Sequence, residues 1–448
     1  MKPTLIFATI IAALGGLLFG FDTAVISGTT HWLEGIYGLS SFWLGFTVAG
    51  ALIGTVIGAI IVGGPADRFG RRNILFSLAI LYFVSALGSA LAWNWYSFLF
   101  FRFLGGLGVG GASVVSPMYI AEISPAKYRG RLVAVTQFNI VLGILLAFFS
   151  NYTITGMNLG AVEWRWMFGV EGFPAVFFFL FLFLIPLSPR WLVARGRIDE
   201  ARVVLDKCGT DTGSVDEEIQ EIQTSLDLEH HSLQEPFYCR KYFKPISLAV
   251  MIAMFNQLSG INALMYYAPK IFKMAGAASE SALLQTVAVG GTNLIFTMAA
   301  LAIIDHFGRR RLMLVGSIGY ILSLGATAWA FYTYGTDFTQ TGSLVVLISL
   351  LVFIASHAFG QGVVIWVFIS EIFPNRVRAR GQALGSFTHW FMAALISWTF
   401  PIIAENSGGH TFAFYAVCMI GQLLWVLLIM PETKGISLEH IQKKLGIE

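Results

Sequence analysis

The sequence predicts an all-α membrane protein with twelve transmembrane helices in two pseudo-symmetric six-helix bundles. Composition is the first observation: of 448 residues, 56% are hydrophobic and 12% are charged, against roughly 25% charged in soluble domains. The second is a polar motif that occurs twice, as DRFGRR at residues 67–72 and DHFGRR at 305–310. The third is another pair at a similar separation, EISP at 122–125 and EIFP at 371–374. Two halves built on the same plan explain both repeats.

The individual spans follow from the apolar runs between these motifs. A bilayer core requires about 20 apolar residues per helix, and the first run, from Leu5, is interpreted as a span rather than a cleaved leader. The predicted spans are residues 5–27, 43–64, 73–92, 96–118, 131–151, 168–187, 246–267, 282–304, 311–332, 342–369, 383–404 and 412–430.

The spans define four regions of the chain. The only long polar stretch follows the sixth span, and its apolar stripes, such as Ile198, Ala201 and Leu205, predict short amphipathic helices. The predicted regions are an N-terminal bundle (1–187), a linker (188–244), a C-terminal bundle (245–435) and a tail (436–448).

Lysine and arginine predict the orientation. Of 28 such residues, only Arg165, Lys270 and Lys273 fall in loops that follow odd-numbered spans. The positive-inside rule therefore places both termini and the linker in the cytoplasm.

Charged residues inside the spans are the first candidates for a functional site. A charge at the bilayer centre costs at least about 2.5–3.5 kcal/mol, so it usually marks an ion or substrate path. Asp22 lies in span 1, Arg102 opens span 4 and Glu171 lies early in span 6. An aspartate facing an arginine can carry a proton if their contact is made and broken. A static ion pair remains the alternative for Asp22, and solvation near the outer membrane edge remains the alternative for Glu171.

Polar and aromatic residues within apolar runs form the second set. Amides both donate and accept, which suits a ligand rich in hydroxyl groups, and aromatic rings can stack on such a ligand. Gly260 would let span 7 bend between its amides. A single amide is more often a contact between helices, but several from both halves indicate a cavity. The candidates are Gln137, Asn256, Gln257, Asn262, Asn293, Phe19, Tyr266, Tyr267, Trp366 and Trp390.

These residues lie within motifs that resemble the sugar porter branch of the major facilitator superfamily. The similarity covers essentially the whole chain. Its motifs are DRFGRR at 67–72, PMYIAE at 117–122, YRG at 128–130, SPRWL at 188–192, QLSGIN at 257–262 and PETKG at 431–435. It implies a major facilitator fold and monosaccharide transport by alternating access, with the sugar held between two bundles.

The resemblance also implies roles for individual residues. Gln137, Gln257, Asn262, Asn293 and Trp366 match the family's sugar-binding positions. Asp22 and Arg102 match a proton-coupling pair, and Glu171 matches an acid implicated in coupling; uncoupled members have a neutral residue at Asp22. A cytoplasmic charge network that locks the outward-facing state is implied at Asp67, Arg71, Glu122, Arg129, Asp305, Arg309, Glu371 and Arg378.

Departures from the family pattern concern the sugar. Asn256 replaces a glutamine, and Val363 replaces the proline of a Gly-Pro pair, so span 10 is expected to flex less. At His357 and His389, this chain resembles a fructose carrier of the family rather than the glucose carriers. They favour a ketohexose such as fructose, unless they are neutral histidines packed between helices.

The sequence therefore predicts a proton-coupled importer of a hexose or pentose in a bacterial inner membrane, acting as a monomer. One alternative is an uncoupled facilitator, against which Asp22 argues. The other is a sugar sensor, against which the short tail after the last span argues. The sequence shows no arrangement of a nucleophile and a base, so an enzyme is not expected. A nucleic-acid partner is not expected either. Cys208, Cys239 and Cys418 lie far apart, so neither a metal site nor a disulfide is expected. No cofactor is predicted; the proton is the coupling ion.

Overall fold

The chain forms long helices that run back and forth. The structure, a computed structural model, describes residues 2–210, 214–232, 236–374, 377–434, 441, 445 and 447, without the side chains of 126, 227–232 and 305. Twelve helical segments in this part of the chain are long and apolar enough to cross a membrane, which confirms the predicted number. The same residues contain no strand.

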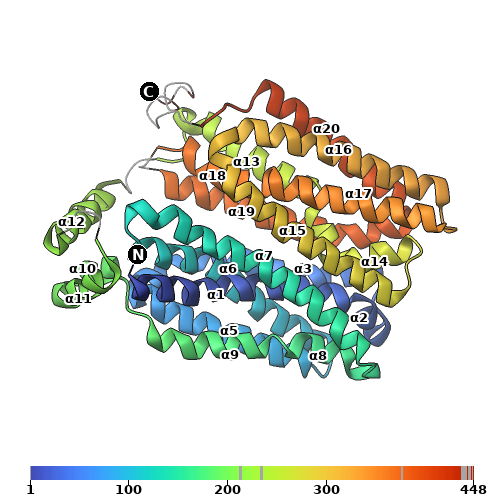
Figure 1. Cartoon of the computed structure of the whole chain (residues 1–448), viewed down its shortest axis with the longest axis horizontal. Coiled ribbons are helices and arrows are strands. Elements are labelled where there is room, and N and C mark those ends of the chain that lie inside the picture. Colours follow the sequence, from blue (N-terminus) through green and yellow to red (C-terminus); the bar gives the residue numbers. More distant parts are fainter. Residues whose placement is uncertain are drawn as a thin grey trace. The chain divides into compact units, whose positions relative to one another are not determined.

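Figure 1 shows the order of the elements. The first half consists of α1 (Pro3–Val25), η1 (Ile26–Gly28), α2 (Thr30–Tyr37), α3 (Ser41–Ile61), α4 (Gly63–Phe69), α5 (Arg71–Ala90), α6 (Trp95–Ile123), α7 (Ala126–Gly156), η2 (Gly160–Val162), α8 (Glu163–Gly169), α9 (Gly172–Phe181) and η3 (Leu182–Leu184). The linker forms α10 (Pro189–Ala194), α11 (Ile198–Cys208) and α12 (Val215–Ser232). The second half consists of η4 (Arg240–Tyr242), α13 (Phe243–Leu258), α14 (Ile261–Met274), α15 (Ser279–Phe307), α16 (Arg309–Tyr334), α17 (Gln340–Phe359), α18 (Gln361–Ile372), α19 (Arg378–Asn406) and α20 (Gly408–Leu428).

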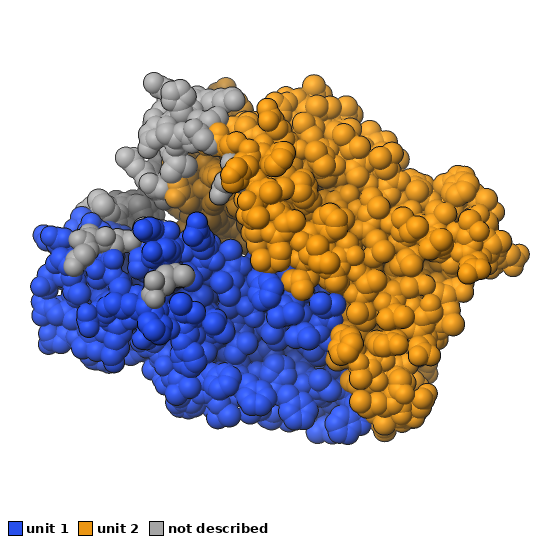
Figure 2. All heavy atoms as spheres, viewed as in Figure 1, with its two compact units in different colours: residues 1–23, 53–147, 164–234 blue, residues 24–52, 148–163, 235–448 orange. Residues whose placement is uncertain are grey.

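The helices form two compact units (Figure 2). Unit 1 contains residues 1–23, 53–147 and 164–234, and unit 2 contains residues 24–52, 148–163 and 235–448. Unit 2 therefore includes η1, α2 and the start of α3. There, Phe46 packs against Trp398 of α19 with ring centroids 5.1 Å apart, and Lys270 of α14 pairs with Glu34 of α2 at 3.1 Å.

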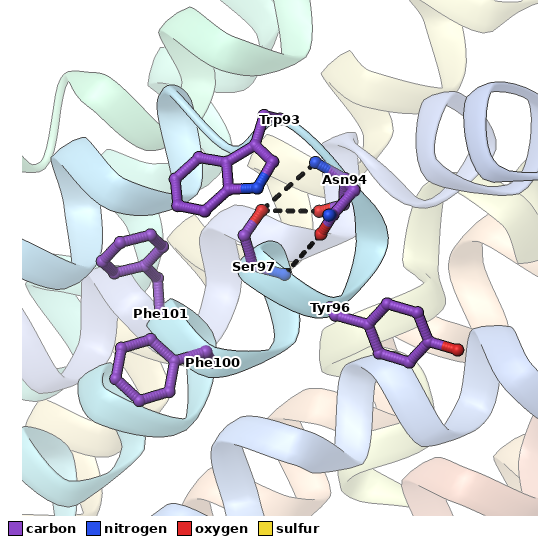
Figure 3. A pocket seen from close by; sticks show the side chains of 6 residues that line it. All are labelled: Trp93, Asn94, Tyr96, Ser97, Phe100 and Phe101. Carbon is purple, nitrogen blue, oxygen red and sulfur yellow. Dashed lines mark hydrogen bonds between the residues drawn. The ribbon is translucent and has the colours of Figure 1, made fainter.

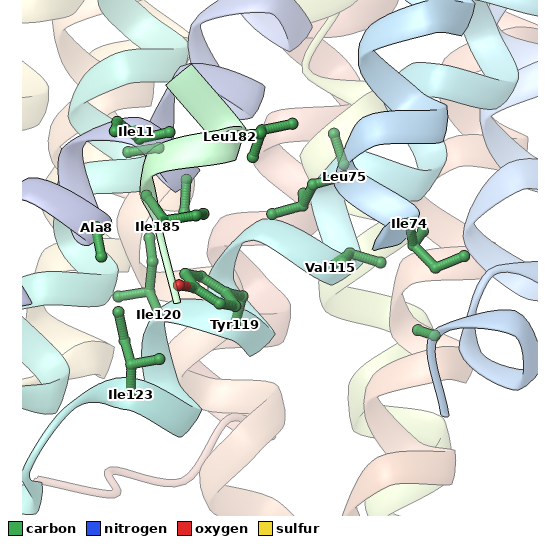
Figure 4. Close-up of a cluster of buried hydrophobic side chains, with 14 of the residues drawn as sticks. Ala8, Ile11, Ile74, Leu75, Val115, Tyr119, Ile120, Ile123, Leu182 and Ile185 are labelled. Atoms are coloured by element: carbon green, nitrogen blue, oxygen red, sulfur yellow. The ribbon is translucent and has the colours of Figure 1, made fainter. Parts of the chain in front are cut away.

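Unit 1 has an apolar core that joins its helices closely. Side chains from α1, α5, α6 and the segment around η3 meet in it (Figure 4). Glycines allow α1 and α7 to approach each other: a Cβ on Gly20 would lie 1.9 Å from the carbonyl oxygen of Ile140, and one on Gly143 would lie 2.1 Å from that of Leu17. Small residues at such contacts are what lets helices associate in lipid.

The linker helices pack on unit 1 through the predicted stripes. Ala201, Val204 and Leu205 of α11 and Ile219 of α12 are buried in its core. Lys2 donates a hydrogen bond to the backbone carbonyl of Asp206, so the start of the chain contacts α11. Burial raises the pKa of the Cys208 thiol to about 11, which keeps it protonated at neutral pH.

Unit 2 contains two interrupted spans. Span 7 breaks as expected at Gly260, whose φ of 84° is left-handed, between α13 and α14. Span 10 was expected to flex less, yet it also breaks, at Gly360 between α17 and α18. The cause is tertiary: Gly360 touches Gly316 of α16, where a Cβ would lie 3.0 Å from the Gly316 Cα.

Candidate functional site

The centre of unit 1 holds a buried ion pair. Arg102 of α6 donates from Nη1 to Oδ1 of Asp22 in α1 at 2.6 Å, and from Nη2 to the Asp22 carbonyl oxygen at 3.1 Å. Both side chains are 2% exposed. The guanidinium also lies over the Phe168 ring at 5.3 Å. The structure thus brings together the two residues that sequence analysis placed in separate spans.

Glu171 joins this pair. It precedes α9 and is 1% exposed, so the solvated alternative considered for it is wrong. Its position in the sequence fixed its depth in the span but not the side of the helix that it faces. In the part of the protein described, neither of its carboxylate oxygens has a hydrogen-bond partner, and Asp22 and Arg102 are the charged groups that act on it.

The charges of this cluster do not balance without a proton. Two carboxylates and one guanidinium leave one negative charge on side chains that are at most 2% exposed. Buried charges are stable only when paired, so like charges at close range favour protonation of one acid. Asp22, Arg102 and Glu171 can therefore hold one proton reversibly.

A polar cluster in unit 2 surrounds the break at Gly260. Asn262 donates from Nδ2 to Oε1 of Gln257 at 2.7 Å, and Gln257 donates from Nε2 to Oδ1 of Asn256 at 2.9 Å. The same Nε2 lies 3.3 Å from both ring nitrogens of His389 in α19. The three amides are 1–9% exposed. The left-handed Gly260 lets residues from two helices present their amides together.

Aromatic rings border this cluster. The His389 ring contacts two tryptophans, with centroids 5.1 Å from Trp366 of α18 and 4.9 Å from the adjacent Trp390. Trp366 is 38% exposed although most nearby residues are buried, so part of its face is free to contact a ligand. His357 bonds through Nδ1 to the Tyr320 hydroxyl at 2.6 Å.

The remaining predicted ligands have different surroundings. Tyr266 is buried, and the Tyr267 hydroxyl donates to the Ser397 carbonyl oxygen at 2.9 Å, which ties α14 to α19. The Asn293 side chain of α15 accepts from Thr297 at 3.4 Å. Gln137 and Phe19 are half-buried and belong to unit 1, while the other nine candidates belong to unit 2.

A charge network lies at the first copy of the repeated motif. Arg71 bonds from Nε to Glu122 at 2.9 Å and pairs with Asp67 at 3.0 Å. Ser188 donates to the other Glu122 oxygen at 2.5 Å. Arg129 donates to the Ala121 carbonyl oxygen at 3.1 Å. This network joins the ends of α4, α5 and α6 to the start of α10.

The second copy repeats this geometry in unit 2. Arg309 bonds to both oxygens of Glu371, at 3.2 and 2.8 Å, and Arg378 donates to the Phe373 carbonyl oxygen at 3.4 Å. Thr433 donates to Glu371 at 2.6 Å, as Ser188 does to Glu122. The side chain of Asp305, predicted as the counterpart of Asp67, lies outside the described part of the structure.

Glu432 completes the second network. Its carboxylate accepts from the backbone N–H groups of Arg309 and Arg310 at 3.0 and 3.1 Å, and so caps the start of α16. It also accepts from the backbone of Thr433 and Lys434 at 2.9 and 3.0 Å.

Sequence reasoning missed several polar groups. Glu432 was noted only as part of a motif, and the partners of Gln361, which are Gln422 and, through it, Ser317, were not anticipated. Tyr82, Ser85 and Ser89 of α5 were also missed. All three are buried and spaced by three and four residues, so a search for polar residues on one helix face could have found them.

A shallow surface pocket of about 440 Å³ lies elsewhere in unit 1 (Figure 3). It is lined at the start of α6 by Trp93, Tyr96 and Phe100 together with the capping residues Asn94 and Ser97. It contains none of the predicted site residues, and exposed aromatic rings at a span end are typical of the membrane interface. Among the residues with described positions, no group of His, Cys, Asp and Glu could hold a metal ion.

Comparison with known proteins gives one consistent result. A family model described as "Sugar (and other) transporter" matches residues 8–445. The chain is 38% identical to the D-xylose-proton symporter of Escherichia coli K12, over 97% of this chain and 94% of that protein. It is 37% identical to the arabinose-proton symporter of Bacillus subtilis, over 96% and 93%. A partially occluded inward-open structure of the E. coli xylose transporter XylE matches with a TM-score of 0.86 and 37% identity, over 97% and 99%. The same symporter bound to 6-bromo-6-deoxy-D-glucose matches with a TM-score of 0.81 and 38% identity, over 99% of both chains. The chain therefore belongs to the sugar transporter family.

Proposed function

We propose that the protein imports a monosaccharide together with a proton by alternating access. The observation that carries this proposal is the buried cluster of Asp22, Arg102 and Glu171, in which two acids share one arginine. The cluster is neutral with one proton bound and carries a negative charge without it. A change in the Asp22–Arg102 contact during transport would therefore bind and release a proton.

The sugar site is proposed at the polar cluster of unit 2. Asn256, Gln257 and Asn262 bond to one another at 2.7–2.9 Å and can exchange these contacts for sugar hydroxyl groups. The partly exposed Trp366 offers a ring face for stacking. Gln137 and Phe19 of unit 1 and Asn293, Tyr266, Tyr267 and Trp390 of unit 2 complete the proposed set.

His389 bears on which sugar is carried. Its ring contacts both the amide cluster, through Gln257, and Trp366. Together with His357 it keeps fructose as a candidate. The relatives named for xylose and arabinose make these pentoses the competing candidates.

Alternating access is supported by the contacts at the predicted outer side. There, residues 24–52 and 148–163, which follow spans 1 and 5, belong to unit 2 together with the second half of the chain. The Glu34–Lys270 ion pair is one of the contacts that join them. An inward-open structure of XylE matches with a TM-score of 0.85, and a partially occluded inward-open one with 0.86. We propose that the two charge networks around Arg71 and Arg309 stabilise the opposite, outward-facing state.

The proposed setting is a bacterial inner membrane, with both termini in the cytoplasm and the protein as a monomer. The test is uptake of radiolabelled sugar into proteoliposomes with an imposed pH gradient, acid outside. We expect accumulation above the external concentration, abolished by a protonophore, and inhibited most by the true substrate in a panel of fructose, xylose, arabinose and glucose. Equal uptake with and without the gradient would identify an uncoupled facilitator instead.

A further inference from the structure

One face of α5 carries three buried hydroxyl groups that nothing described above uses. Tyr82, Ser85 and Ser89 are 0%, 1% and 0% exposed. Their spacing places them on the same side of the helix. None of the three hydroxyls has a hydrogen-bond partner within the described structure. Serine in a membrane helix commonly bonds to the backbone of its own preceding turn, and these two serines do not.

This face borders the acid cluster. The link is Gly105 of α6, which has no side chain to separate the two helices. The position that a Cβ would occupy there lies 2.3 Å from the Ser85 Oγ and 3.1 Å from the Asp22 Oδ1. The hydroxyl and the carboxylate are therefore close enough for one water molecule to bridge them.

The acid cluster presents unused groups as well. The Nε of Arg102 and both oxygens of Glu171 have no partner in the part of the structure described. Hydroxyls can donate and accept, the arginine N–H can only donate, and carboxylates accept. Buried polar groups left unpaired in this way are normally satisfied by internal water, which makes two to four hydrogen bonds. A metal cation fits less well, because Arg102 already places its positive charge 2.6 Å from Asp22.

We propose that Tyr82, Ser85 and Ser89 bind a short file of water molecules that carries protons to and from Asp22 and Glu171. The inference rests on the proton coupling proposed above. A hydronium ion gives its proton to the first oxygen of the file, and each oxygen accepts one proton while passing on another. The last oxygen protonates a carboxylate. Each oxygen of the file then carries the same number of protons as before, and the charge of the cluster has risen by one.

The file has a direction. Ser89 lies two turns beyond Tyr82, next to Ala90 at the end of α5. Arg165 holds this end by donating to the carbonyl oxygens of Ala90 and Ala92 at 2.6 and 3.0 Å. The positive-inside rule places this end outside, so the file leads from the outer side towards Asp22. The titratable and charged groups around it are Asp22 of α1, Tyr82 of α5, Arg102 of α6, Glu171 before α9 and, at its outer end, Arg165 of α8.

The test compares Ser85→Ala with Ser85→Thr, which keeps a hydroxyl, and with Ser77→Ala. Ser77 is on the same helix but is exposed, and its hydroxyl bonds to the Asn73 carbonyl oxygen. Two rates are measured across external pH: proton-driven uptake, and exchange between sugar-loaded compartments. We expect Ser85→Ala to slow driven uptake about tenfold, in the range expected for the loss of one buried hydrogen bond, and to shift its pH profile. Exchange should stay unchanged. Ser85→Thr should restore the wild-type profile, and Ser77→Ala should match wild type.

Two results would overturn the water file. One is a wild-type pH profile in Ser85→Ala; the other is an equal loss of driven uptake and exchange, which indicates a packing role. If Ser85→Ala does not fold, Ser89→Ala, which removes another buried hydroxyl of the file, serves as the second variant, with the same expectations. Asp22→Asn separates the two proposals. If it abolishes coupling while Ser85→Ala changes nothing, the file fails and the proposed function stands. If coupling survives Asp22→Asn, Asp22 is not the proton carrier and a file that ends at it fails. The proposed function itself fails if wild-type uptake does not respond to the pH gradient.

Discussion

Replacing Asp22 by asparagine is expected to uncouple sugar movement from the proton gradient without unfolding the protein. The amide oxygen can still accept from Arg102, which now approaches Oδ1 at 2.6 Å, and Glu171 supplies the one negative charge that the guanidinium needs. The variant cluster is neutral without a proton and has no reason to bind one. Arg102→Ala is different, because it leaves two buried acids without a counter-charge, and a broken buried pair costs about 3–5 kcal/mol.

The size of the effect follows from the gradient. One pH unit is worth about 1.4 kcal/mol for each proton, so one proton per sugar supports about tenfold accumulation. In Asp22→Asn the ratio of internal to external sugar should fall to about one. Exchange between two sugar-loaded compartments should persist, since it needs no net proton movement.

Proteoliposomes with an imposed pH gradient measure both quantities in one preparation. The sugar-induced current is an independent readout. Wild type should carry one positive charge with each sugar, whereas Asp22→Asn should carry sugar without charge and so give no current. Glu171→Gln serves as the matched variant, because it also leaves one carboxylate and one guanidinium, so that this cluster too is neutral without a proton. The reasoning would be refuted by tenfold accumulation in Asp22→Asn, or by a sugar-induced current equal to that of wild type.

The other predictions concern the charge networks, the sugar site and the end of the chain. Glu122→Gln and Arg309→Gln should each favour inward-open states, seen as faster labelling of cysteines introduced in the cytoplasmic vestibule; unchanged labelling in both would count against a lock. Gln257→Ala should weaken sugar binding by about 1–3 kcal/mol, because a sugar hydroxyl loses its partner in a dry site, and titration of the purified protein measures this. His389→Gln should shift the preference from fructose towards aldoses in transport competition, and an identical ranking of sugars would make His389 a packing residue. Glu432→Ala should lower stability by about 0.5–2 kcal/mol by removing the cap of α16, detectable as a lower unfolding temperature, whereas an unchanged temperature would show that the cap contributes nothing.

Hydropathy alone predicted the number of spans, because the cost of burying polar groups in lipid acts on each segment separately. The break at Gly260 was equally predictable, since a left-handed residue between two apolar turns favours glycine. The break at Gly360 was not, because its cause is contact with Gly316 of another helix. The sequence of span 10 has Val363 in place of the family's proline, and this absence alone gave no sign of a break.

In the site too, features that depend on the local sequence were predictable, and features that depend on contacts with other helices were not. Asp22 and Arg102 stood out because charges are rare in membrane spans. The family resemblance implied that Glu171 acts with them, but the span alone does not show that it faces them, since a position along a span gives depth and not the direction of the side chain. Ser85 and Ser89 resemble many serines that bond to their own helix, and only the structure shows that these two do not.

The cap on α16 has a consequence for how the protein is made. Glu432, synthesised 123 residues after Arg309, accepts hydrogen bonds from the first turn of the helix that begins at Arg309. More than a hundred residues of the second half must therefore wait in the membrane with that turn incomplete. The cap can form only after residue 432 has left the ribosome. A ribosome that stops just short of Glu432 therefore releases a product that contains all twelve candidate spans but lacks the cap on this turn.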